Sequence, residues 1–435
     1  MYTGQQVLKS YIKNFPLYRT YAYKTIKRPD INKTPKKTAS PKKETLEKAT
    51  SLTGQLQAKI LATGPITVAD YMKEVLTNPT GGYYMQRDVF GVQGDFITSP
   101  EILQIFGELI TIWCINEWQK IGTPSPLQII ELGPGRGTLA RDVIKVLGHF
   151  KLKAEVSLHL IELSPFLSNV QAQSICYQHE EVDQTKTNDL FYRKGETATG
   201  IKVFWYKKLE DVPKKFSIVL ANEFFDALPI HKFQKDVNVW KEILIDLDNS
   251  NQNKLRFVIS KSQTPHSKFY QHIKNDERDC VEYSFEGAKI IELLATRLES
   301  YGGIALIIDY GHFGEKTDTF RAFKNHKLHN PLDDPGTADL TADVDFTHIK
   351  HHAEKDGKLI TFGPVDQGIF IKRMEGDTRL NILLERCSPE QKQEIITGYD
   401  MLTNPEKMGS RFKVFAMFPA ILKDYLEKFK VSGFH

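Results

Sequence analysis

The sequence of 435 residues predicts an α/β fold: a Rossmann-like, doubly wound sheet with helical additions at both ends and an inserted hairpin. Two observations support this prediction. Short apolar runs, each long enough for one buried strand, alternate with helical stretches along the middle of the chain. The run at 127–132 passes directly into a glycine-rich loop and a helix, as the first βα unit of such a sheet does.

The glycine-rich loop is predicted to approach a cofactor. Its residues Gly133, Gly135 and Gly137 permit positive φ and a close backbone approach, and Glu131 at the end of the strand is a polar contact. A dinucleotide pattern would place its third glycine at Thr138, one residue later. The spacing therefore resembles motif I of S-adenosylmethionine (SAM) methyltransferases, although a different nucleotide or a purely structural turn remains an alternative.

A second acid follows the next strand. The apolar run 156–161 ends at Glu162, about 25 residues after the glycine loop, where a carboxylate can accept hydrogen bonds from both ribose hydroxyls. An acid can also stand there by chance. We expect Glu162 to contact the cofactor.

A third polar group follows the strand predicted at 216–221. Asn222, Glu223 and Asp226 should face the glycine loop, because the carboxyl ends of parallel strands meet at one edge of the sheet. They are the candidate catalytic residues. The structural alternative is that Asn222 caps a helix and Glu223 interacts with its dipole.

A buried strand at 304–308 brings Asp309 and Tyr310 to the same edge. The polar region after it carries further acids, including Asp339 and Asp343. A metal site could in principle be formed by His348, His351 and His352, but their number and spacing do not favour one, so no metal is expected.

The rest of the chain suggests a division into four parts. Residues 1–45 form a leader, 52–121 a helical region with candidate lid loops, 122–365 the core, and 366–435 a helical end. Within these parts, we expect an amphipathic helix at 102–118, lid or connector segments at 81–84 and 94–101, a surface excursion at 177–200, and a hairpin from 237–246 and 255–260.

Charge separates the leader from the body. Up to Lys43 there are eleven Lys or Arg residues and one acid, Asp30, which leaves 47 basic and 53 acidic residues elsewhere. An amphipathic, basic start is typical of a mitochondrial transit peptide, although a disordered basic tail is an alternative. The mildly acidic body disfavours nucleic-acid binding. Since the longest apolar runs are under eighteen residues, no membrane span is expected.

The motifs together resemble the MidA family over the chain from about residue 52 to its end. The resemblance is carried by Gly81-Gly82-Tyr83-Tyr84, Gly94-Asp95-Phe96-Ile97-Thr98-Ser99-Pro100-Glu101, Glu131-Leu132-Gly133-Pro134-Gly135-Arg136-Gly137, Asn222-Glu223-Phe224-Phe225-Asp226, Asp309-Tyr310-Gly311-His312 and Gly336-Thr337-Ala338-Asp339-Leu340-Thr341-Ala342-Asp343-Val344-Asp345.

The resemblance implies a function. Mitochondrial members of this family are protein-arginine methyltransferases that act as complex I assembly factors. It therefore implies SAM as cofactor, and symmetric dimethylation of an arginine on a complex I core subunit in the mitochondrial matrix. Glu223 and Asp226 could hold the guanidinium in a bidentate clasp. Two alternatives stay open: a SAM methyltransferase of a small molecule, and a non-enzymatic assembly chaperone on the same fold.

Overall fold

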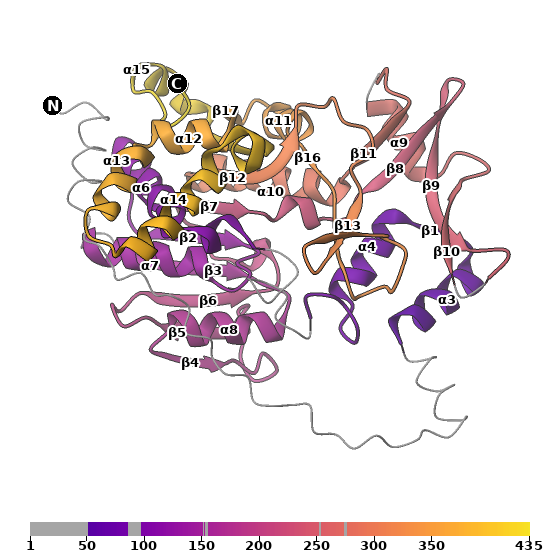
Figure 1. The fold of residues 1–435 in the computed structure, drawn as a ribbon, viewed down its shortest axis with the longest axis horizontal. Coiled ribbons are helices and arrows are strands. Elements are labelled where there is room, and N and C mark those ends of the chain that lie inside the picture. Colours follow the sequence, from indigo (N-terminus) through magenta and orange to yellow (C-terminus); the bar gives the residue numbers. More distant parts are fainter. Residues whose placement is uncertain (1–50, 86–96, 151, 153–154, 252–253, 274–275) are drawn as a thin grey trace.

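A ten-stranded mixed sheet forms the centre of the molecule (Figure 1). The computed structural model describes residues 51–435 except 86–96, 151, 153–154, 252–253 and 274–275, so the expected leader lies outside the described residues. The strands follow the spatial order β17 (Leu359–Asp366), β18 (Phe412–Pro419), β12 (Gly303–His312), β7 (Ser217–Asn222), β2 (Leu127–Leu132), β3 (Val156–Ile161), β6 (Lys202–Tyr206), β5 (Arg193–Glu196), β4 (Gln178–Glu181), and β16 (Val344–Asp345) pairs with β12.

The five strands from β12 to β6 are mutually parallel, and their neighbours on both sides run antiparallel. Both β2 and β7 are buried along their whole length, which explains why their sequences are continuous rather than alternating apolar runs. Along β2, Ile129 packs into one apolar cluster and Ile130 into another. The sheet is therefore covered on both faces, as a doubly wound fold requires.

Helices far apart in the sequence cover the two faces. One face packs against α6 (Gln104–Lys120), α7 (Thr138–Phe150), α8 (Pro165–Ile175), α12 (Gln367–Arg373), α13 (Gly376–Leu384) and α14 (Pro389–Thr403), and the other against α10 (Phe285–Tyr301) and α11 (Phe346–Glu354). The remaining short elements are α5 (Ser99–Ile102), η1 (Leu209–Asp211), η2 (Phe225–Ala227), η3 (Pro405–Gly409), η4 (Ala420–Leu422) and α15 (Lys423–Lys428).

The helix expected to be amphipathic is buried nearly all round. Helix α6 packs against α7 on one side and α13 on another. Its Glu108 lies in this second contact and forms an ion pair with the fully buried Arg379 at 2.8 Å. The expectation was wrong because it gave α6 a solvent face, whereas residues from the far end of the chain cover that face.

Two other segments differ from expectation. The polar stretch 177–200 contributes β4 and β5, an antiparallel hairpin at the edge of the main sheet, although β4 is fully exposed. The C-terminal part is not only helical, because β18 lies inside the sheet between β12 and β17 with all its residues buried. The core sheet therefore extends beyond the boundary expected at residue 365.

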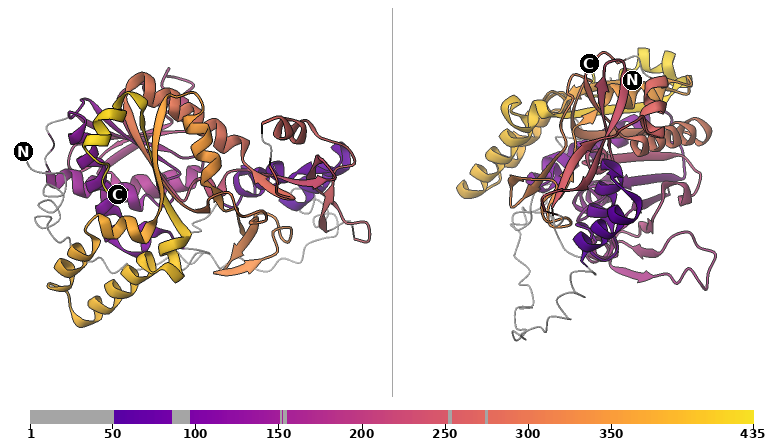
Figure 2. Two further views of the ribbon diagram at one scale, coloured as in Figure 1. Left: turned by 90° about the horizontal axis from the view of Figure 1, so that it is seen from above. Right: turned by 90° about the vertical axis from the view of Figure 1, so that its right-hand side faces the viewer.

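A second, antiparallel sheet lies beside the core, at the right in Figure 1 and in the left view of Figure 2. The predicted hairpin is present in it, but three more strands join it. Its members are β1 (Ile66–Thr67), β8 (His231–Asp236), β9 (Val239–Leu247), β10 (Leu255–Ile259) and β11 (Cys280–Tyr283), with α3 (Leu52–Thr63), α4 (Val68–Thr77) and α9 (Pro265–Ile273) packed on it.

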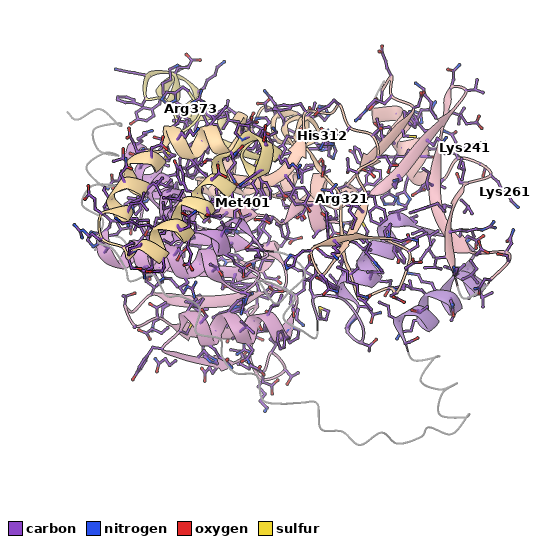
Figure 3. The ribbon with its side chains drawn as sticks, in the orientation of Figure 1. Lys241, Lys261, His312, Arg321, Arg373 and Met401 are labelled. Atoms are coloured by element: carbon purple, nitrogen blue, oxygen red, sulfur yellow. The ribbon has the colours of Figure 1, made fainter. Side chains whose placement is uncertain are left out.

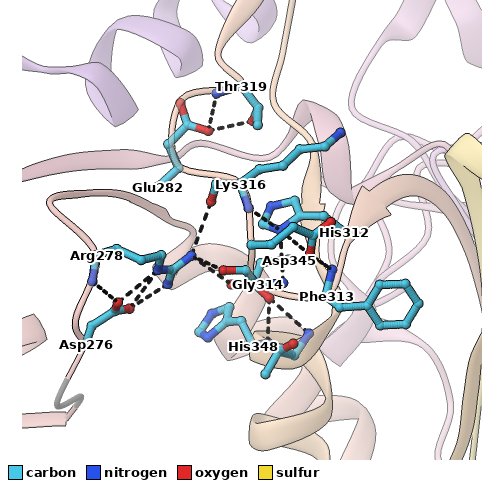
Figure 4. A network of polar contacts seen from close by, with 12 residues as sticks. Asp276, Arg278, Glu282, His312, Phe313, Gly314, Lys316, Thr319, Asp345 and His348 are labelled. Carbon is cyan, nitrogen blue, oxygen red and sulfur yellow. Dashed lines mark hydrogen bonds and ion pairs between the residues drawn. The ribbon is translucent and has the colours of Figure 1, made fainter.

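A network of polar contacts fastens this second sheet to the core (Figure 4). Arg278, next to β11, binds Asp276 and donates a hydrogen bond from Nη1 to the carbonyl oxygen of Gly314 at 2.7 Å. The segment after β12 is thereby held in place. It leads into a small sheet of β13 (Arg321–Lys324), β14 (Lys327–His329) and β15 (Asp339–Thr341), which contacts α4.

Candidate functional site

A cleft of about 2400 Å³ opens at the carboxyl edge of the parallel strands. Its walls come from the core, the small sheet and the C-terminal helices. Arg321 of β13 and Met401 of α14, both labelled in Figure 3, are among its lining residues. The predicted site residues that line it are Glu131, Gly133, Gly135, Glu162, Asn222, Glu223 and Asp226. The three acid-ended strands therefore do converge on one cavity, as the sheet topology predicts. Gly137 is not among its lining residues.

The glycine loop adopts the backbone conformation that its sequence predicts. Gly133, Gly135 and Gly137 have φ values of 62°, 54° and 78°, in the left-handed region that other residues rarely adopt. A Cβ on Gly133 would lie 2.7 Å from Cδ2 of Phe224. The loop thus packs against the segment after β7 with no room for a side chain at Gly133.

Glu162 is held by contacts that sequence reasoning missed. Its Oε1 accepts a hydrogen bond from the Ser164 backbone N–H at 2.8 Å, and its Oε2 accepts one from Gln171 at 2.9 Å. Gln171 also donates to the carbonyl oxygen of Gly135 at 2.7 Å, and Trp205 donates to Gln171. Gln171 therefore joins the acid to the glycine loop. Gln171 lies in the interior of α8, and no sequence pattern distinguishes a glutamine there from one on a solvent-exposed helix face.

Glu131 is buried at the end of β2 with no partner for its Oε2. Burial and the neighbouring carboxylates of Asp142 and Glu162 raise its pKa to about 8. A buried acceptor without a donor costs free energy. It is therefore suited to a cationic or hydrogen-bond-donating ligand group in the cleft.

Glu223 also has an unusual environment. Its φ is 51°, and its Oε1 accepts a hydrogen bond from the backbone N–H of Ser99, the first residue of α5, at 2.7 Å. Burial is the main reason why its pKa rises to about 8. The adjacent Asn222 has a buried Oδ1 without a partner. Glu223 therefore accepts a hydrogen bond from a helix N-terminus, as the structural alternative proposed. The helix is α5, however, and not the η2 turn that follows Glu223 in the chain.

Asp226 is fixed on one side only. Its Oδ2 accepts hydrogen bonds from the hydroxyls of Tyr310 and Thr341, the second at 2.9 Å. Its Oδ1 is buried and has no partner, and burial raises its pKa. One oxygen of Asp226 is thus used to orient the side chain, and the other is left as an acceptor.

Asp309 has a structural role that the sequence did not predict. Its Oδ2 accepts hydrogen bonds from the backbone N–H groups of Phe224, Phe225 and Asp226, at 2.9–3.3 Å. Asp309, rather than Asn222, therefore satisfies the backbone donors at the start of η2. The strand predicted at 304–308 delivers it to the correct edge, where it shapes the loop that carries the candidate catalytic residues.

The expected absence of a metal stays a prediction. Of the three histidines considered above, His352 forms a hydrogen bond between its Nδ1 and Oε1 of Glu292 at 2.8 Å. Within the described ranges, one group has the ligand-atom spacing of a metal site: His231, Glu242 and His266 in the second sheet, with all three atoms within 4.8 Å. His231 and Glu242 lie 2.6 Å apart and already satisfy each other.

The candidate lid segment 81–84 reaches the cleft. Of the two candidate lid segments, 81–84 is described, whereas residues 94–96 lie outside the described residues. Tyr84, at the end of the first segment, lines the cleft. In the described part of the chain, no helix combines the length and the hydropathy needed to cross a bilayer.

The chain is similar to known proteins in both sequence and fold. Residues 109–365, more than half of the chain, match a family model described as "Putative S-adenosyl-L-methionine-dependent methyltransferase". A Drosophila melanogaster protein named "Protein arginine methyltransferase NDUFAF7 homolog, mitochondrial" is 55% identical over 426 residues, or 96% of this chain and 97% of the relative. The human "Protein arginine methyltransferase NDUFAF7, mitochondrial" is 50% identical over 374 residues, 85% of this chain and 84% of the relative.

A solved structure agrees on the fold. The crystal structure of a COG1565 superfamily protein from Burkholderia thailandensis, bound to S-adenosyl-homocysteine, superimposes with a TM-score of 0.69. The two sequences are 22% identical, and the match covers 88% of this chain and 95% of the other. The family resemblance predicted from the motifs is confirmed by these matches.

Proposed function

The chain belongs to the family of S-adenosyl-L-methionine-dependent methyltransferases, and we propose that it methylates arginine side chains of a protein. Relatives of high identity that match nearly the whole chain are named as protein arginine methyltransferases. The observation that carries the proposal is the pair of carboxylates in the cleft beside the cofactor loop, the half-buried Glu223 and the buried Asp226. A guanidinium needs such partners, and most neutral substrates do not.

The residues present fit the family's cofactor. SAM would be held by Glu131, Gly133, Gly135 and Glu162, and it supplies a methyl group on a sulfonium. Gly137 does not line the cleft and would act only through the turn of the loop, where its φ is 78°. The unpartnered Oε2 of Glu131 is a suitable acceptor for the ammonium of its amino-acid part. Glu162, oriented by Gln171, has acceptor capacity left for ribose hydroxyls, because a carboxylate has about four lone-pair sites.

The carboxylates after β7 have two tasks in this proposal. Glu223 and Asp226 orient the guanidinium, so that one nitrogen faces the methyl group while charge is favoured on the others. A methylated guanidinium keeps its positive charge, so one N–H proton must leave the nitrogen that gains the methyl. Glu223, whose pKa is about 8 in the free protein, is suited to accept that proton. Asn222 adds an amide whose Oδ1 can accept a hydrogen bond.

The size of the cleft favours a protein substrate over a small molecule. Pockets for single small ligands are typically about 300–1000 Å³. The cleft measures about 2400 Å³, and it runs from the glycine loop to the small sheet and to α14. That volume leaves space for a polypeptide segment beside the cofactor.

The finer proposal concerns the target. We propose symmetric dimethylation of an arginine of a complex I core subunit in the mitochondrial matrix, in support of complex I assembly. The relatives' names include the word mitochondrial, and residues 1–43 have the basic, amphipathic character of a transit peptide.

The test is mass spectrometry of complex I subunits from cells that lack this protein, with and without its return. Return of the parent protein should restore symmetric dimethylarginine at one site together with assembly. Arginines that are unchanged by loss of the protein would refute the proposal. Return of a Glu223→Gln variant separates catalysis from chaperoning: restored assembly without methylation would assign a non-enzymatic role.

A further inference from the structure

A further carboxylate, that of Asp339, lines the same cleft as Glu223 and Asp226. Asp339 begins β15, and its Oδ1 accepts a hydrogen bond from the hydroxyl of Tyr84 at 2.7 Å. Tyr84 follows α4 in the N-terminal helical region, and both side chains line the cleft. Two parts of the chain, 255 residues apart, thus meet at one polar contact inside the proposed substrate site.

The acids near this contact have different uses. Asp309 is fully buried, and its Oδ2 alone accepts three backbone N–H groups, so it shapes the loop. Asp343 forms an ion pair with Arg321 at 2.6 Å and another with Lys316, which hold its pKa below the usual value although burial opposes them. Asp226 differs from both, since its buried Oδ1 has no partner.

Tyr84 and Tyr310 lie close to both Asp226 and Asp339. Burial raises the pKa of each tyrosine above its usual value, and the charges of these two acids add to the effect. Both hydroxyls therefore stay protonated and donate, Tyr84 to Asp339 and Tyr310 to Asp226. The two acids and the two tyrosines all line the cleft.

We propose that Asp339 and Tyr84 complete the guanidinium site opposite Asp226, so that the N-terminal helical region supplies part of substrate recognition. Asp226 accepts one N–H group of the guanidinium through Oδ1, and Asp339 accepts another from the facing side. Tyr84 is a positioning residue, which holds Asp339 in the orientation that meets the substrate. This inference rests on the proposed arginine substrate.

The test measures binding rather than turnover. N-acetyl-arginine amide and its neutral isostere N-acetyl-citrulline amide are titrated by ligand-observed NMR into the full protein saturated with S-adenosylhomocysteine. Parent protein should prefer the arginine compound. Asp339→Asn should weaken that binding by about tenfold or more, because the amide keeps the shape but removes the charged hydrogen-bond partner of the guanidinium. Tyr84→Phe should weaken it by about threefold to tenfold, since its loss affects only the orientation of Asp339.

A matched control distinguishes this role from a loss of packing. Tyr71→Phe also removes one hydroxyl from the N-terminal region, but that hydroxyl donates to the carbonyl oxygen of Pro331, and Tyr71 does not line the cleft. It should leave arginine binding at the parent value. Binding by Tyr84→Phe and Asp339→Asn at the parent affinity would overturn the inference while leaving the proposed function intact. If parent protein bound both compounds equally, the arginine substrate itself would fail.

Discussion

Individual acids in the cleft share one kind of environment but differ in their remaining hydrogen-bond capacity. Glu131 and Asp226 are buried and Glu223 is half-buried, and all three have raised pKa values. Asp309 is equally buried, yet its carboxylate is used by the backbone. We therefore expect the acids that keep an unused acceptor oxygen to bind cofactor or substrate. Their negative charge matters once a cationic group of a ligand binds in the cleft.

Glu223→Gln tests the proposed clasp. The amide is nearly isosteric and can still accept the Ser99 N–H, so we expect the fold and SAM binding to survive. Methyl transfer should fall by about 30-fold to 1000-fold, which corresponds to the loss of 2–4 kcal/mol in the transition state. Single-turnover rates together with calorimetry of SAM binding make the measurement. Methylation at the parent rate would leave Glu223 only its contact with α5.

Glu131→Gln tests the pKa of the cofactor-side acid. Its pKa rises from 4.5 to about 8 on folding, so between these values the folded protein keeps a proton that the unfolded chain has lost. The free energy of unfolding therefore falls as pH rises through this window, by about 1.4 kcal/mol per pH unit from this group. Without cofactor, the variant should lack that contribution. Urea unfolding across the window should show the variant gaining on the parent as pH rises; parallel curves would place the pKa of Glu131 near its ordinary value.

At the scale of elements, local sequence patterns predict those features that local physics determines. The apolar runs of β2, β3, β7 and β12 indicate buried parallel strands, and three glycines with acid-ended strands indicate a cofactor edge. The position of β18 between β12 and β17 has no local signal, because its pairing partners lie far away in the chain. The burial of α6 could not be predicted for the same reason. Its outer face is covered by residues far away in the chain, which the Glu108–Arg379 ion pair joins to it.

The site could be predicted in part for the same reason. Glu131, Glu162, Asn222, Glu223 and Asp226 follow strands, so topology alone places them at one edge. Gln171 and Tyr84 lie on or after helices, and their roles depend on tertiary packing of α8 and α4.

Gly135→Val tests the glycine loop as an element. Gly135 has a φ of 54°, and a β-branched side chain there would be strained and would occupy the cofactor's side of the loop. We expect loss of detectable SAM binding by calorimetry in a protein that still folds. Gly122→Val is the control, since its φ of 95° carries similar strain and nothing lies within 4 Å of a Cβ there. Unchanged SAM affinity in Gly135→Val would mean that the loop is not the cofactor site.

At the scale of the whole molecule, the leader is predicted to be separable from the catalytic body. Deleting residues 1–43 removes eleven basic residues and leaves an acidic remainder. The truncated protein should fold and bind SAM but fail to enter mitochondria, as fractionation of cells expressing either form would show. Normal import of the truncated form would show that the address lies elsewhere in the chain.

The junction between the second sheet and the core helps to position one wall of the cleft. Arg278 binds the carbonyl oxygens of Gly314 and Lys316, just ahead of Arg321, which lines the cleft. Glu131 belongs instead to β2 and the glycine loop follows that strand, whereas the contacts of Arg278 are with Asp276, Gly314, Lys316 and Asp345.

Arg278→Gln should therefore separate substrate binding from cofactor binding. The KM for the protein substrate should rise about tenfold, which corresponds to the loss of roughly 1.4 kcal/mol from charged hydrogen bonds, while the Kd for SAM stays at the parent value. Arg256→Gln is the matched control, because Arg256 lies in the same sheet but binds Asn249 and Leu247, away from the cleft. Steady-state kinetics with both substrates varied make the measurement. Equal effects of the two arginine variants would mean that the junction adds stability alone, and that the second sheet does not shape substrate recognition.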